Sequence, residues 1–193
     1  MASRGNSRAR NEILEMLKED HQRVKKAFKT AEKLHGQDED EELQALVEQT
    51  CIEIQIHAQL EEELFYPAAR EAVKEQDLIE EAEVEHGSAR TLIEQLQAMA
   101  PDDPKYFATF TVLGEYVKHH IKEEENELFG QLGSSRSKVQ WEELQQQMLT
   151  MRETLMAEMG LVEEEEDDED TRSATRARRG RSRQTADEEE TVE

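Results

Sequence analysis

Apolar residues recur every three to four positions along five stretches of the chain, and this spacing is typical of amphipathic helices. The first stretch ends at His35-Gly36, and the third ends at a segment with two prolines, 101–104, where a helix cannot continue. Pro67 lies inside the second stretch and is expected to kink or interrupt its last turns. The predicted helices cover approximately residues 11–34, 38–68, 76–100, 105–132 and 138–159.

These helices predict an all-α fold, and 193 residues suit one domain with a single core and an extra element. We predict an antiparallel up-down four-helix bundle over residues 11–132, preceded by a flexible N-terminal arm over residues 1–10. An additional C-terminal amphipathic helix over residues 138–160 places Trp141 and Met148 on its apolar face. Such a face usually packs on its own bundle, although adaptable methionine-rich faces also dock partner proteins.

The composition of the chain changes at Glu163. Eight consecutive acidic residues, 163–170, are followed by six arginines between Arg172 and Arg183 and then by a second acidic block. Charge blocks of this kind cannot bury a core, so residues 163–193 are predicted to form a disordered acidic and basic tail. The flanking acids are expected to neutralise the arginines within the chain, which argues against nucleic acid binding by the arginine run.

The whole chain is strongly acidic, with a formal net charge of -23 and 37% charged residues. This surface repels nucleic acid and anionic membranes, so neither is an expected partner. Cys51 is the only cysteine, which excludes an intramolecular disulfide, and the N-terminal segment lacks the apolar run of a secretory signal. The sequence also has no run of about 18 apolar residues that could span a membrane. These features predict a cytoplasmic protein.

Four histidines lie on the apolar faces of four different predicted helices, and two of them are followed by a glutamate four residues later. In the pairs His57–Glu61 and His120–Glu124, both side chains therefore point in the same direction from the helix. Each pair is preceded by a lone histidine at a similar distance, 36 and 34 residues, which indicates a repeat of two helical hairpins. Two such hairpins facing each other would gather four imidazoles and two carboxylates at one level. The four histidines are His21, His57, His86 and His120.

Two ionised glutamates in an apolar core cost several kcal/mol each unless a cation or hydrogen-bond donors compensate them. The inward faces offer no lysine or arginine at this level, so bound metal is the simplest compensation. Four imidazoles and two bridging carboxylates would give each of two metal ions about four protein bonds and leave open positions. Mixed nitrogen and oxygen ligands suit iron, manganese or zinc. A ferritin-like di-iron bundle needs two Glu-x-x-His motifs, and here only Glu83 and His86 match one.

The segments HAQLEEELFYPAA, from His57, and HHIKEEENELF, from His119, resemble the two HxxxE signatures of hemerythrin-like, HHE cation-binding domains. The resemblance covers about residues 11–132. It implies a non-haem di-iron centre, with two iron ions bridged by an oxo or hydroxo group. By position, it makes four residues terminal iron ligands, His21, His57, His86 and His120, and two residues bridging carboxylates, Glu61 and Glu124.

Two features depart from the oxygen-carrying members of that family. Arg90 stands where those members have a second histidine on the third helix, and the second signature is HxxxE and not their HxxxxD. The resemblance therefore places the chain with a broader, functionally diverse branch and weakens the expectation of reversible oxygen storage. Arg90 is expected to make an ion pair near the rim of the site. Tyr116 lies one turn before His120 and either packs or reaches the site, while His119 is expected to face away from it.

Three functional hypotheses follow from the residues and the resemblance. In the first, the centre binds O2, NO or a peroxide at an open coordination position for sensing, storage or detoxification. In the second, the same centre is an enzyme that reduces peroxide or NO, and the sequence does not distinguish binding from turnover. In the third, the protein is an iron sensor or scaffold that contacts a protein partner through residues 138–193.

Overall fold

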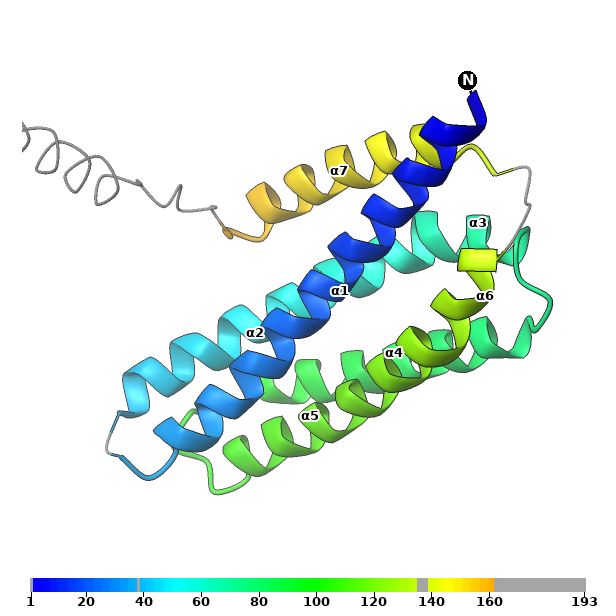
Figure 1. Ribbon diagram of the computed structural model, residues 1–193. Coiled ribbons are helices and arrows are strands. Elements are labelled where there is room, and N and C mark those ends of the chain that lie inside the picture. The colour runs from blue at the N-terminus through cyan, green and yellow to red at the C-terminus, as the bar shows by residue number, and fades with distance from the viewer. Residues whose placement is uncertain (1, 38, 135–138, 162–193) are drawn as a thin grey trace, which may run out of the picture. The chain divides into compact units, whose positions relative to one another are not determined.

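The computed structural model describes residues 2–37, 39–134 and 139–161, and within these ranges the fold is all-helical, as predicted. Four long helices lie side by side in Figure 1, where α1 packs against α2 and α5, and α4 packs against α5 and α2. The fifth long helix, α7, packs on α1 and α2. The long helices are α1 (Ala2–Leu34), α2 (Asp40–Leu60), α4 (Asp77–Ala98), α5 (Tyr106–Glu123) and α7 (Trp141–Glu158).

Four short helical segments extend α2 and α5. The π-helical turn η1 (Glu61–Phe65) and helix α3 (Tyr66–Arg70) follow α2, whereas the π-helical turn η2 (Glu124–Leu128) and helix α6 (Phe129–Ser134) follow α5. The predicted interruption at Pro67 is present, because α2 changes its hydrogen bonding just before this residue, which lies in the first turn of α3. The same change occurs at η2, whose residues include no proline, so proline alone does not explain it.

The prediction of a flexible arm over residues 1–10 is wrong, because α1 begins at Ala2. Its first turns are held by the start of α7. The Asn6 side-chain amide donates to the carbonyl of Val139, over 2.8 Å, and its oxygen accepts the backbone N–H of Trp141, over 2.6 Å. Ala9 is buried in the same region. A contact between residues more than 130 positions apart stabilises this end of α1, and the local sequence pattern could not show it.

The buried apolar residues form two clusters, and a polar layer separates them along the bundle. On α1, His21 lies between Leu17 of one cluster and Val24 of the other. On α2, His57 lies between Leu60 and Ile54 in the same way. Apolar packing above and below thus fixes the depth of the histidines.

The apolar face of α7 packs on its own bundle, which was the favoured interpretation of the fifth amphipathic stretch. Trp141, Leu144, Met148 and Leu155 are buried there. No helix in the described ranges is both long and apolar enough to span a bilayer. The predicted tail, residues 163–193, lies outside the residues that the structure describes.

Candidate metal centre

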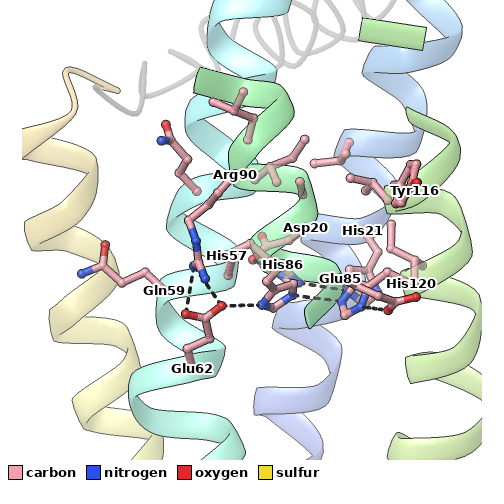
Figure 2. Close-up of a pocket in the computed structure, with 18 of the residues that line it drawn as sticks. Asp20, His21, His57, Gln59, Glu62, Glu85, His86, Arg90, Tyr116 and His120 are labelled. Carbon is pink, nitrogen blue, oxygen red and sulfur yellow. Dashed lines mark hydrogen bonds and ion pairs between the residues drawn. The ribbon is translucent and has the colours of Figure 1, made fainter. Parts of the chain in front are cut away.

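The structure brings together all six side chains that the sequence singled out, inside the bundle and away from solvent. The four imidazoles come from α1, α2, α4 and α5 and form two pairs (Figure 2). The Nε2 atoms of His21 and His57 are 3.1 Å apart, and those of His86 and His120 are 3.2 Å apart. Four ring nitrogens therefore point toward one small region.

Each buried glutamate lies between one imidazole of each pair. Glu61 Oε2 is 3.2 Å from His57 Nε2 and 3.4 Å from His86 Nε2. Glu124 Oε2 is 3.2 Å from His21 Nε2 and 3.8 Å from His120 Nε2. Glu61 is fully buried, and Glu124 is only 3% exposed. The ligand atoms form two groups that could each hold a metal ion, and the groups share Glu61. One contains His21, His57, Glu61 and Glu124, and the other Glu61, His86 and His120.

The two glutamates occupy equivalent places in their helices, because each is the first residue of a π-helical turn. In these turns the backbone N–H of Tyr66 donates to the carbonyl of Glu61, and that of Phe129 donates to the carbonyl of Glu124, five residues back. Single π-helical turns within α-helices occur frequently at functional sites. The repeat seen in the sequence is therefore also a repeat of local backbone structure.

Besides the two central glutamates, a further carboxylate contacts the Nδ1 atom of each imidazole, the ring nitrogen that points away from the centre. Asp20 Oδ2 lies 3.4 Å from His57 Nδ1, and the other three carboxylates approach their Nδ1 atoms to 2.9–3.0 Å. This pattern orients Nε2 toward the centre and is usual for histidines that bind metals. The full set of pairs is His21–Glu125, His57–Asp20, His86–Glu62 and His120–Glu85.

The sequence analysis missed these four carboxylates, although a signal was present. Asp20 and Glu85 directly precede the lone histidines of the two halves, and Glu62 and Glu125 directly follow the buried glutamates. A search for acidic neighbours of each ligand position, repeated in both halves, would have found them.

Each outer carboxylate is paired in turn with a basic side chain. Arg90 Nη1 donates to both oxygens of Glu62 at 2.9 Å, which is the ion pair expected near the rim. Asp20 is paired with Arg152 of α7 and with Arg23 of its own helix. Thus the fifth helix contributes a residue to the surroundings of His57. The remaining contacts are Glu125 with Lys25 and Glu85 with His119.

The charges of the site favour the protonated forms of His57 and His120 and the ionised form of Glu61. Burial opposes a charged His57, yet the carboxylates of Glu61 and Asp20 outweigh it and hold the pKa of His57 well above its usual value. Burial also opposes a charged His120, but Glu85 and Glu124 raise its pKa. Burial favours protonated Glu61, but the nearby imidazoles lower the pKa of this carboxyl, His57 most strongly. Protons and metal ions therefore compete for the same nitrogens.

The donor set fits metal ions. Glu61 Oε1 is buried and has no hydrogen-bond partner, and Glu124 Oε2, although 3.2 Å from His21 Nε2, makes no hydrogen bond either. A buried carboxylate oxygen without a partner is costly, and a bound cation removes this cost. Imidazole nitrogens and carboxylate oxygens together are the ligands that iron, manganese and zinc accept.

A cavity of about 290 Å³ adjoins the centre on the side of the imidazoles. All four histidines line it, together with Arg90 and Glu62, whereas Glu61 and Glu124 do not. Since one water occupies about 30 Å³ of liquid, the space is larger than a diatomic molecule needs. Most of the remaining wall is apolar, with contributions from Val24, Ile54, Ala89, Ile93, Val117 and Ile121.

Two other candidates from the sequence are largely exposed. The side chain of His119 is 61% exposed and contacts Glu123 and Glu85 at the surface. Tyr116 is 49% exposed and lines the cavity. The hydroxyl that does reach the centre belongs to Tyr66, which the sequence analysis did not consider. Tyr66 is five residues after Glu61, a spacing that points about 140° away in an α-helix, so only the π-helical turn explains its position.

Comparisons with known proteins agree with this geometry. A protein described as a DNA nickase, from Nostoc sp. (strain PCC 7120 / SAG 25.82 / UTEX 2576), is 26% identical over 141 residues. The match covers 73% of this chain but only 39% of that relative, so the chain spans about two fifths of its length. No solved structure matches the chain. The model of the hemerythrin HHE cation-binding domain matches residues 12–132, and the chain therefore belongs to this family.

Proposed function

We propose that the chain holds two iron ions between the two histidine pairs and binds O2, NO or a peroxide at them. The observation that carries this proposal is the convergence of four Nε2 atoms on two buried carboxylates, two of whose oxygens have no hydrogen-bond partner. His21 and His57 would hold one ion, and His86 and His120 the other. Glu61 and Glu124 would bridge them, as the distances to both pairs favour.

The side chains also suggest where the small ligand binds. Two imidazoles and two shared carboxylates give each ion about four protein bonds, and six-coordinate iron would retain open positions. The cavity reaches the imidazole side of the centre, so the open positions are proposed to face it. Its apolar wall favours an uncharged small molecule over bulk water. Iron bound there would supply electrons and a Lewis acid to that molecule.

Metal content and ligand response test the proposal directly. Purified protein would be loaded with Fe²⁺ without air, assayed for iron per chain, and exposed separately to O2, H2O2 or NO while absorption is recorded. His120→Ala should lose iron and the spectral response, whereas the matched variant His35→Ala, altered at an exposed histidine just beyond α1, should keep both. One iron or none per chain in the parent protein would overturn the proposal.

The same experiment separates binding from the enzymatic alternative. A centre that reduces peroxide or NO would consume many equivalents per chain when a reductant is supplied, while a sensor or store would react once.

The contact from Arg152 to Asp20 favours a sensor in which α7 responds to the metal. Unchanged partner pull-down after deletion of residues 138–193 would remove this segment from that role.

The activity in the name of the Nostoc relative calls for one further control. We expect no nicking of supercoiled plasmid DNA by this chain, because its net charge of -23 repels the DNA backbone. Gel electrophoresis of plasmid incubated with iron-loaded protein would show the outcome.

A further inference from the structure

The two halves of the centre are nearly equivalent, and they differ at one aromatic residue. Tyr66 and Phe129 occupy the same place in the repeat, five residues after Glu61 and Glu124. Each ring stacks on an imidazole. The Tyr66 ring lies 5.7 Å from that of His86, and the Phe129 ring lies 6.0 Å from that of His21. Only the first half carries a hydroxyl at this position.

That hydroxyl lies between the two bridging carboxylates. Tyr66 Oη is 3.2 Å from Glu61 Oε2 and 3.3 Å from Glu124 Oε1, and the side chain is fully buried. In the described part of the chain no other hydroxyl bonds either carboxylate. Because a phenol has one proton, it donates to one carboxylate at a time and remains close to the other.

The hydroxyl lies on the side of the centre away from the cavity. The four imidazoles line the cavity, but Tyr66, Glu61 and Glu124 do not. The tyrosine therefore contacts the carboxylates and leaves the face that a small ligand reaches unobstructed. The residues beside Tyr66 are also held by packing, because Phe65 and Phe129 contact each other in the same apolar cluster.

We propose that Tyr66 is a positioning residue that holds Glu61 and Glu124 in the bridging arrangement. The inference rests on the proposed metal centre and goes beyond it, because it assigns a role to a residue that is not a ligand. Hydrogen bonds to ligating carboxylates fix their orientation and tune the metal. Loss of the hydroxyl should therefore weaken metal binding without changing the six ligands.

The repeat itself provides the test. Affinity for Co²⁺ would be measured by chelator competition without air, and the absorption of bound Co²⁺ would report the ligand geometry. Tyr66→Phe should lower the affinity about 10- to 100-fold, as is typical for loss of an outer-shell partner. Tyr106→Phe removes the hydroxyl of a buried tyrosine in the other apolar cluster and should leave the affinity unchanged. The double variant Tyr66→Phe/Phe129→Tyr moves the hydroxyl to the other half of the centre. If Tyr66→Phe loses a hundredfold in affinity for Co²⁺, the double variant should bind Co²⁺ at least tenfold more tightly than Tyr66→Phe.

The outcomes separate this inference from the proposed function. If the parent protein binds no Co²⁺, the metal centre itself fails. If the parent binds but Tyr66→Phe has the affinity and spectrum of the parent, only the role of Tyr66 is overturned. A loss that Phe129→Tyr does not recover would also overturn it, because the effect would then come from packing and not from the hydroxyl.

Discussion

Metal binding to this protein should depend steeply on pH, because the metal must replace protons. Metals bind neutral imidazole, whereas the pKa of His57 is raised well above its usual value and that of His120 is also raised. Glu61 remains ionised, since the pKa of this carboxyl is lowered. In the metal-free protein, protonated His57 and His120 thus offset the negative charge of buried Glu61. Bound metal would take over this role and release the protons.

The sign and size of the effect follow from the number of protons displaced. A higher pH removes the protons that compete with the metal for the imidazoles. The apparent metal affinity should therefore rise with pH and fall as His57 and His120 become protonated. Displacing one proton, from His57, gives a slope of one in logarithmic units, and displacing a second, from His120, gives a slope of two. This corresponds to about a 10- to 100-fold increase in affinity per pH unit, or about 1.4 to 2.7 kcal/mol.

Zinc affinity can be measured by chelator competition between pH 7 and 8, and a pH indicator in weak buffer counts the released protons. Asp20→Asn removes a carboxylate that raises the pKa of His57, so the slope should decrease in this variant. Glu115→Gln, at an exposed position of α5, should leave the slope unchanged. A parent affinity independent of pH, with no proton release, would refute the reasoning.

Three further predictions concern packing and access. Gly114→Ala places a Cβ 2.8 Å from the ring of buried Phe28 and should destabilise the fold by about 1–2 kcal/mol. The melting temperature should fall by about 2–8 °C. The control Gly87→Ala, whose Cβ meets nothing within 4 Å, should not lower Tm. Arg152→Gln removes a partner of buried Asp20 and should lower the free energy of unfolding in urea by about 1–3 kcal/mol. Arg23→Gln should lower it less, because the Arg23 side chain is 48% exposed. Ala89→Leu narrows the cavity and should weaken NO binding, measured by absorption, while the iron content stays unchanged. The control Val84→Leu should have no effect, because Val84 of the same helix is 71% exposed.

The ligand positions were predictable because helix geometry is local. A residue's direction from a helix follows from its spacing to apolar neighbours, and this placed His57 with Glu61 and His120 with Glu124 on inward faces. The repeat of two hairpins then implied that all six side chains lie at one level. The pairing of Asp20 with Arg152 was not predictable, because Arg152 reaches Asp20 from a helix 132 positions away. Such a pairing depends on how α7 packs and leaves no periodic signal.

The sequence by itself determined the helices, the inward histidines and the chemistry of the centre, since periodicity and residue type decide these within one helix. Tertiary structure decided the helical first turns of α1, which Asn6 holds through contacts with Val139 and Trp141. It also decided the position of Tyr66, because η1 departs from the α-helical register that spacing assumes. The cavity beside the imidazoles arises in the same way, from the shape left between four helices whose side chains do not fill it.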